Sequence, residues 1–168
     1  MAEVLFQSIL DLPKLTIQNP FVYVTKGEVV GQLPKGLHSA IPITVSCWRS
    51  SRLATQHHCG ECIPCISRRI AVESNKLMFK EYERDLFSED TKSLDHSDPG
   101  KRNLVDLAEF IGHFSGRLSK SEVELTETYP ELFNKHFDRD QVVKMYRRFA
   151  TEASQVLATY PNAKWVLQ

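Results

Sequence analysis

The 168-residue sequence lacks a net charge, a long apolar run, and cysteine outside one short segment. Lysine and arginine together number 21, as do aspartate and glutamate, so no overall field would hold a nucleic acid or an anionic membrane. No apolar stretch approaches the ~20 residues of a transmembrane helix, and Met1-Ala2-Glu3 has no basic flank of a secretory signal. We therefore expect a soluble cytoplasmic protein of one domain, or of one small domain plus an appendage.

The cysteines that are present lie in about a tenth of the chain, at Cys47, Cys59, Cys62 and Cys65. In a reducing compartment such clustering is more typical of a metal site than of disulfides. The Cys59-x-x-Cys62 pair favours a tight turn that directs two sulfurs at one ion, and Gly60 can adopt the positive φ that this turn often needs. Four thiolates fill every tetrahedral position on Zn²⁺, so the predicted zinc is structural rather than catalytic.

Other uses of four cysteines fit this spacing less well. A redox dithiol would leave two of them unexplained, and the spacing matches neither common ferredoxin pattern of an iron–sulfur protein. A nucleic-acid zinc ribbon usually has two separated Cys-x-x-Cys pairs, whereas here Cys47 stands alone where the first pair would be. His57 and His58 adjoin Cys59 and could replace a thiolate or donate to one, although loop histidines are the simpler interpretation.

Short stretches of apolar residues before the cysteines predict a mixed α/β segment. Residues 15–17 and 21–24 have the composition and length of strands. Thr25 is predicted to cap a helix, with Glu28 as its reciprocal partner three residues later. We expect this helix to end at Leu33, because the proline that follows disfavours helical geometry in the residue before it.

The rest of the chain is predicted to be helical. A helix after the cysteines would bury Ile66, Ile70 and Leu77, and residues 73–98 predict a helix that gives way to a solvated linker. The next helix has one apolar face, made by Leu104, Leu107, Ile111, Phe114 and Leu118. A long final helix follows Asp138 and Asp140 and ends before Pro161, with an apolar face of Val142, Met145, Phe149, Ala153, Val156 and Tyr160.

Three sequence blocks carry a resemblance to a known family. They are residues 19–30 (NPFVYVTKGEVV), residues 46–48 (SCW) and residues 58–68 (HCGECIPCISR). In order and content they resemble the C-terminal part of the 7-cyano-7-deazaguanine synthase family, over roughly residues 1–75. The resemblance implies an adenine-nucleotide alpha-hydrolase-like fold and an ATP-dependent ligase that converts 7-carboxy-7-deazaguanine and ammonia to the nitrile, on the route to queuosine. It also implies that the zinc ligands are Cys47, Cys59, Cys62 and Cys65.

The sequence departs from this family at the nucleotide site and at its C-terminal end. The pyrophosphate-binding Ser-Gly-Gly-x-Asp-Ser loop is absent, and no Gly-Gly pair occurs anywhere. Binding of ATP therefore requires a nucleotide-binding domain or subunit supplied elsewhere. We expect a zinc-binding α/β fragment over residues 1–94, a linker at 95–100 and an α-helical extension over 101–168, predominantly helical overall.

Two basic residues are candidates for substrate binding. Lys26 and Arg68 match positions in the family blocks, and either could meet an anionic substrate or phosphate. For Arg68 the alternative is packing along the zinc loop, with its guanidinium facing the thiolate charge. Thr25 and Glu28 are better explained as a capping box.

Two functions from different classes follow. The first is the zinc-bearing portion of a synthase-like ligase, with a nucleotide-binding partner and a deazapurine-like small molecule as its ligand. The second is a non-catalytic, zinc-stabilised interaction module, as in family-like proteins of antiphage defence operons. Neither hypothesis requires a membrane or a nucleic acid as partner.

Overall fold

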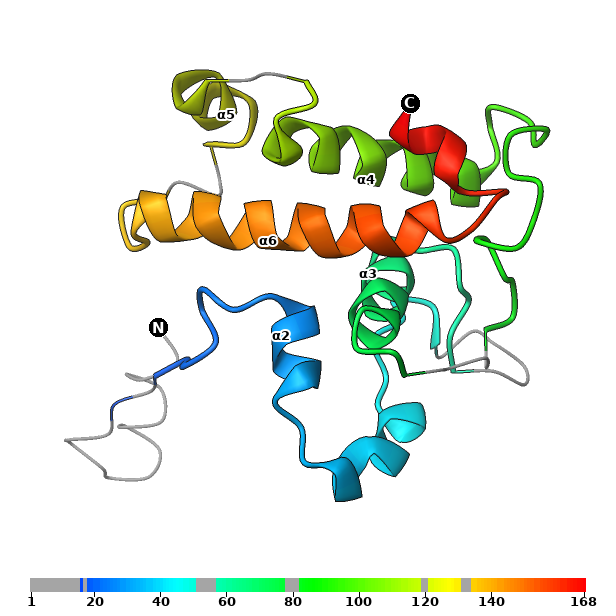
Figure 1. Ribbon diagram of the computed structural model, residues 1–168, viewed down its shortest axis with the longest axis horizontal. Helices are drawn as coiled ribbons and strands as arrows, with labels where there is room; N and C mark the ends of the chain where they lie inside the picture. Colours follow the sequence, from blue (N-terminus) through cyan, green and yellow to red (C-terminus); the bar gives the residue numbers. More distant parts are fainter. Residues whose placement is uncertain (1–15, 17, 51–56, 78–81, 119–120, 131–133) are drawn as a thin grey trace.

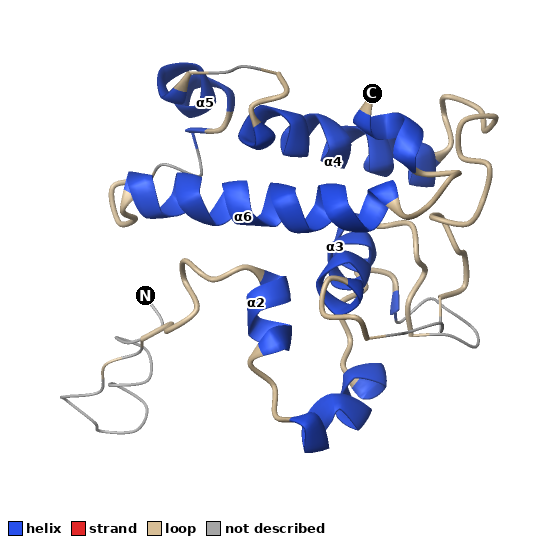
Figure 2. Ribbon diagram, in the orientation of Figure 1, coloured by secondary structure: helices blue, strands red, loops and turns tan. Residues whose placement is uncertain are grey.

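The computed structural model describes residue 16 and residues 18–50, 57–77, 82–118, 121–130 and 134–168. Within these ranges the chain forms helices joined by turns, and no strand occurs (Figure 2). None of the helices found there has both the length and the apolar character needed to span a membrane. The elements in chain order are α2 (Lys26–Gly31), the 3₁₀ helix η1 (Lys35–Ile43), α3 (Ile63–Glu73), α4 (Pro99–Ser115), α5 (Glu122–Thr128), α6 (Arg139–Ala158) and the 3₁₀ helix η4 (Lys164–Leu167).

Helices α4 and α6 lie side by side and form the centre of the arrangement (Figure 1). The 3₁₀ helix η4 packs on both of them, and α3 packs against α6 and α4. Helix α2 packs on α3 and contacts α6 from the side opposite α4 (Figure 1). The helices beyond the cysteines are therefore packed on the cysteine-bearing part of the chain through α3. The domain boundaries at 94 and 101 stay a prediction.

The prediction of a strand at residues 21–24 is wrong, because residues 20–23 form a turn. The side chain of Asn19 accepts a hydrogen bond from the Phe21 N–H at 2.9 Å, and the Val24 N–H donates to the Phe21 carbonyl at 3.1 Å. Asparagine followed by proline favours this local turn, which overrides the β propensity of the apolar residues. The strand expected at residues 15–17 falls largely outside the described residues. The described chain is thus mostly helical, and the α/β class is not seen in it.

The capping box at the start of α2 is confirmed. The Glu28 N–H donates to the Thr25 hydroxyl at 3.0 Å, and the Thr25 N–H donates to Glu28 Oε2 at 2.8 Å. The helix ends at Gly31, two residues before the predicted Leu33. In α3, Ile66 and Ile70 are buried as predicted, whereas Leu77 lies beyond the end of the helix.

One apolar core joins the helices. Asp98 and Asp138 cap α4 and α6. The predicted face of α4 is buried up to Phe114, whereas on the predicted face of α6 Met145 and Phe149 are only partly buried and Tyr160 lies beyond the end of the helix. Leu118 is exposed, because Gly116 ends α4 in a left-handed conformation with φ of 79°. The helix expected to run on from residue 73 is not seen in the described residues 74–77 and 82–98, which form turns, and Leu86 and Phe87 of these turns lie in the core. The buried members of the core are Ile66, Ile70, Leu86, Phe87, Leu104, Leu107, Ile111, Phe114, Leu125, Ala150, Ala153, Val156, Leu157 and Ala163.

Candidate metal centre

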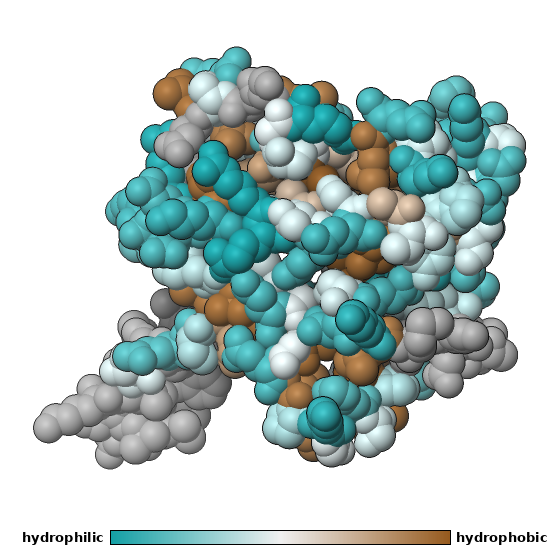
Figure 3. Space-filling view, in the orientation of Figure 1, coloured by the Kyte–Doolittle hydropathy of each residue, from teal (hydrophilic) through white to brown (hydrophobic). Residues whose placement is uncertain are grey.

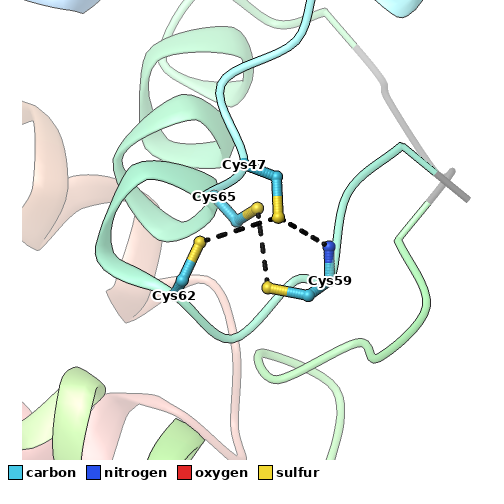
Figure 4. A group of neighbouring side chains, drawn as sticks. All are labelled: Cys47, Cys59, Cys62 and Cys65. Atoms are coloured by element: carbon cyan, nitrogen blue, oxygen red, sulfur yellow. Dashed lines mark hydrogen bonds between the residues drawn. The ribbon is translucent and has the colours of Figure 1, made fainter. Parts of the chain in front are cut away.

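The four cysteines converge on one point. Their sulfurs all lie within 4.8 Å of one another and are buried (Figure 4). The Sγ atoms of Cys59 and Cys65 are 3.9 Å apart, and those of Cys62 and Cys47 are 4.0 Å apart. A tetrahedron with each sulfur ~2.3 Å from zinc has edges of about 3.8 Å. The arrangement can therefore hold a metal ion, and its size and ligand chemistry suit Zn²⁺.

Local conformation explains how three of these sulfurs come together. Gly60 has φ of 82°, in the left-handed region that favours glycine. Cys62 is the N-cap of α3, and the proline in the first turn of this helix is compatible with helix initiation. Cys65 then lies in the first turn, so its sulfur is presented beside the first two. The turn and the helix start predicted from the Cys-x-x-Cys spacing are confirmed.

The fourth sulfur is positioned by backbone hydrogen bonds. Cys47 follows η1, and its sulfur accepts from the N–H of Arg49 at 3.3 Å and from the N–H of Cys59 at 3.5 Å. Hydrogen bonds from backbone N–H groups stabilise a sulfur that carries negative charge. Burial raises the pKa of the Cys47 thiol, but these two donors together with the thiols of Cys59 and Cys65 lower the pKa overall.

For two other cysteines burial outweighs the hydrogen bonds, so the net shift of the pKa is upward. Burial raises the pKa of Cys59 to about 11 and raises the pKa of Cys65 further. Four neighbouring thiolates in a buried site would repel one another unless a cation compensated their charge. Metal binding would therefore displace protons from these thiols, and its affinity would fall at low pH.

The cysteine turn is anchored to α4 by an arginine that sequence reasoning missed. The N–H groups of Glu83 and Arg84 donate to the carbonyls of His58 and Cys59 at 2.9 and 3.2 Å. The guanidinium of Arg84 forms ion pairs with Glu61, with Glu89 and with Asp98, the N-cap of α4. These acids are 5 to 23 residues away in sequence, so no local pattern indicates their meeting.

Neither histidine beside Cys59 joins the converging ligand atoms. His58 is buried, and the centroid of its ring lies 5.9 Å from that of Tyr82, whereas His57 is exposed. The described geometry therefore favours a set of four sulfurs over a mixed set with nitrogen. The histidines are loop residues beside the cluster.

The candidate substrate residues Lys26 and Arg68 both line a cavity of about 290 Å³ beside η1. Arg68 is buried, and its guanidinium donates to the Thr44 hydroxyl at 2.7 Å and to the Ile41 carbonyl. Lys26 is exposed at its edge, and desolvation and the charge of Arg68 lower the pKa of this lysine, while Cys65 acts in the opposite direction. The two cations thus lie within electrostatic range of each other and of the sulfur cluster. Their role in substrate binding stays a prediction.

The Thr25–Glu28 motif holds α6 in place, through two residues that sequence reasoning missed. The Thr25 hydroxyl donates to Glu152 Oε1 at 2.7 Å. Arg148 donates through Nε to Glu28 Oε1 at 2.6 Å and through Nη2 to the Tyr23 carbonyl at 2.7 Å. The partners are more than 100 residues apart, so spacing in the sequence contains no signal for these contacts.

The part of the chain that carries the cysteines matches a known protein family. Residues 2–76 match the family described as "Queuosine biosynthesis protein QueC". Searches of curated proteins and of solved structures find no significant match. The match covers the three sequence blocks, all four cysteines and helices α2 and α3, and it ends before α4. Residues 2–76 of this chain are therefore QueC-like and similar to the C-terminal part of the 7-cyano-7-deazaguanine synthase family.

Proposed function

We propose that the chain is the zinc-binding portion of a 7-cyano-7-deazaguanine synthase-like ligase. The observation that carries the proposal is the convergence of four buried sulfurs inside the QueC-like segment. Cys47, Cys59, Cys62 and Cys65 are the zinc ligands, and the bound ion supplies a cross-link between the segment after η1 and the start of α3. With four sulfur ligands the ion has no open position for water, so its role is structural.

The electrostatics beside the cluster support this assignment. Zn²⁺ with four thiolates carries a net charge of −2, and burying this charge is unfavourable unless nearby cations compensate it. Lys26 and Arg68 are both within electrostatic range of the cysteines. Arg68 thus stabilises the centre while it fastens η1 to α3, and Lys26 is the cation with more access to solvent.

The ligase reaction requires parts that this sequence does not contain. No Ser-Gly-Gly-x-Asp-Ser loop is present to hold the phosphates of ATP, so a nucleotide-binding domain or subunit supplies adenylation. In this proposal the chain works in the cytoplasm, where the thiols stay reduced before they bind metal. Lys26 and Arg68 face the carboxylate or phosphate of a deazapurine-like substrate in the 290 Å³ cavity.

A second candidate is a non-catalytic, zinc-stabilised interaction module. It is favoured because Thr25 and Glu28 make structural contacts with α6, through Glu152 and Arg148 respectively. It is also favoured by large apolar side chains that remain exposed around η1 and the first cysteine, namely Leu37, Ile43, Val45 and Trp48. Exposed apolar side chains grouped in this way are typical of a surface that contacts a partner.

Metal analysis tests the part that both candidates share. Protein purified without added zinc should contain about one zinc per chain, and Cys62→Ser should release it, because a ligand is lost from a closed four-sulfur site. Ser50→Ala, close to Cys47 in sequence, is the control and should retain the metal. Full thermal stability after chelation, or a metal content near zero in the wild-type protein, would contradict a structural zinc.

A mixing experiment separates the two candidates. The zinc-loaded chain is combined with a protein that carries the Ser-Gly-Gly-x-Asp-Ser loop, and ATP-dependent formation of the nitrile is measured. The ligase proposal expects this chain to increase the rate, and Lys26→Met to reduce that increase. No effect of the chain on the rate, together with stable binding to the same protein, would favour the interaction module.

A further inference from the structure

The 3₁₀ helix η1 and the residues that join it to the first cysteine present large apolar side chains to solvent. Leu37 and Val45 are about half exposed, and Ile43 and Trp48 are 78% and 76% exposed. They make up four of the nine large hydrophobic residues that are exposed in the described parts of the chain, so such exposure is concentrated here. Hydrophobic atoms are visible among polar ones at the lower end of the molecule, where η1 lies (Figure 1 and Figure 3). We call these four residues the η1 patch.

The register of η1 explains why part of this patch faces outward. In a 3₁₀ helix, side chains three residues apart lie above one another. His38 and Ile41 form the inner row, because Ile41 is buried and Nε2 of His38 lies 3.2 Å from the Leu33 carbonyl oxygen. Leu37 and Ile43 belong to a second row, which is turned to solvent. In the described residues the helices beyond the family match make no extensive contact with η1, so this row stays uncovered.

The backbone that carries the patch is fastened at two places. Arg68 of α3 donates to the Ile41 carbonyl and, at 2.7 Å, to the Thr44 hydroxyl. Cys47 contributes its sulfur to the four-sulfur cluster, and Trp48 is the next residue. Apolar side chains on a backbone that is already fixed lose less conformational entropy when they bind a partner. A metal ion at the four sulfurs would therefore fix the end of the patch that contains Trp48.

The charge around the patch is positive. No aspartate or glutamate occurs between Glu28 and Glu61, and Lys35 and Arg49 are exposed at the two ends of the patch. Arg49 pairs with Glu61, whereas Lys35 forms no ion pair among the described residues. An apolar surface with this rim is complementary to apolar side chains flanked by carboxylates. Two cations give little attraction to an anionic membrane, which is held by larger clusters of lysine and arginine.

We infer that the η1 patch binds an acidic amphipathic segment of another protein, with apolar side chains against Ile43 and Trp48 and a carboxylate at Lys35. The cysteine cluster then has a second role, because a metal ion there holds the docking surface in its binding conformation. The inference rests on the second candidate function and deepens it by naming the chemistry of the partner. Zinc content and the rate of nitrile formation are measured without this partner, so failure of the inference is distinguishable from failure of either candidate function.

The test uses two fluorescent peptides of equal length, one of leucine and glutamate and one of leucine and lysine, each spaced to form an amphipathic helix. Binding to the zinc-loaded full chain is measured by fluorescence anisotropy. We expect saturable binding of the glutamate peptide, about tenfold tighter than that of the lysine peptide. Ile43→Ser and Trp48→Ser should each weaken the glutamate peptide about tenfold or more, because each removes apolar contact. Val105→Ser, at an exposed position of α4 outside the patch, is the matched control and should leave the affinity unchanged.

Two further measurements test the charged rim and the cluster. Lys35→Glu should weaken the glutamate peptide and strengthen the lysine peptide, each about threefold. Removal of zinc by chelation should weaken the glutamate peptide, because the end of the patch at Trp48 is no longer held. If the zinc-free chain does not keep its helices, the substitutions at the exposed positions Ile43 and Trp48 decide the question, since they leave the core intact.

Several outcomes would overturn the inference. It fails if neither peptide binds saturably, if the two peptides bind alike, or if Ile43→Ser and Trp48→Ser both leave the affinity unchanged. Self-association of the chain that Ile43→Ser abolishes would assign the patch to a second copy. Binding to phosphatidylglycerol vesicles that the same variant abolishes would assign it to an anionic membrane. Either assignment would replace the acidic protein segment as the occupant.

Discussion

Around the four cysteines, Tyr82 is the partly buried hydrophobic side chain that packs against the cluster. The cluster centred on α4 and α6, by contrast, joins buried apolar side chains from α3 to the C-terminal residues. Among the described residues the cysteine region buries little apolar surface, so a bound ion would add substantially to the backbone hydrogen bonds that hold it. The helical region gains its stability from removing apolar side chains from water.

The two regions meet within a single helix. Cys65 and Ile66 are neighbours at the start of α3 and are both almost fully buried, yet Cys65 faces the sulfur cluster and Ile66 the apolar core. The direction of side chains around a helix separates two adjacent residues into two environments. Loss of the metal should therefore disturb the start of α3 and leave α6 largely unaffected.

The largest effect is expected from removal of a buried metal ligand. Cys65→Ser should lose zinc, and structural zinc contributes about 10–16 kcal/mol of apparent binding free energy in zinc-finger peptides. Hydrogen exchange should then show loss of amide protection around residues 58–66, with α4 and α6 still protected. Equal loss of protection in α4 and α6 would show that the two regions are not stabilised separately.

Truncation of a side chain in the apolar core should have the reverse effect, with stability lost and zinc retained. Leu157 is fully buried in α6, and Leu157→Ala should lower the free energy of unfolding by about 2–5 kcal/mol through lost burial and a cavity. Zinc content should stay at one ion per chain below the unfolding transition. Urea denaturation followed by circular dichroism measures the free energy of unfolding, and metal analysis measures the zinc content. Val105→Ala, at an exposed position of α4, is the control and should change stability by less than about 0.5 kcal/mol.

A smaller effect is expected from a glycine in the cysteine turn. Gly60→Ala places a Cβ at positive φ and against the carbonyl of Arg84, which costs at least about 1–2 kcal/mol and should weaken zinc binding. Competition with a chromophoric chelator measures the change in affinity. Gly36→Ala is the matched control, because a Cβ there meets nothing within 4 Å. Unchanged zinc affinity in Gly60→Ala would mean that the turn adapts without moving the sulfurs.

The smallest effect concerns the contact between α2 and α6 and depends on pH. The hydrogen bond from Arg148 lowers the pKa of Glu28 below its usual 4.5, so its contribution is present above that pH and is lost as pH falls through the folded value. Burial raises the pKa of Glu152, so its contribution is fully present below 4.5 and is lost as pH rises through the folded value.

Substitution of these two carboxylates should therefore have opposite signs. At neutral pH Glu28→Gln should lower the free energy of unfolding by about 0.2–1 kcal/mol, typical of a partly exposed ion pair, and Glu152→Gln should raise it slightly. Both differences should shrink as the pH falls below 4. Denaturant unfolding at several pH values measures them, and a loss of stability in Glu152→Gln at neutral pH would contradict the assigned sign.

Local spacing was enough to predict much of the cysteine region and the helices. The Cys-x-x-Cys turn, the positive φ of Gly60 and the capping box at Thr25 depend on residues within a few positions of one another. The buried face of α6 follows from a period of 3.6 residues, which any helix of that sequence must present. The strand at residues 21–24 was wrong because a turn formed by Asn19 competes with β propensity over the same short range.

Tertiary packing decided the contacts between distant segments. Glu28 could be recognised as the partner of Thr25 but not of Arg148, and Phe87, in a stretch expected to be a helix that leads into a solvated linker, is buried against Tyr160. The spacing of the cysteines indicated a metal site, and the fold brought Lys26 within electrostatic range of that site. The physical reason is that caps, turns and helix periods involve neighbouring residues. Ion pairs and cavities depend instead on which helix faces meet, and that is decided by burial of apolar side chains over the whole chain.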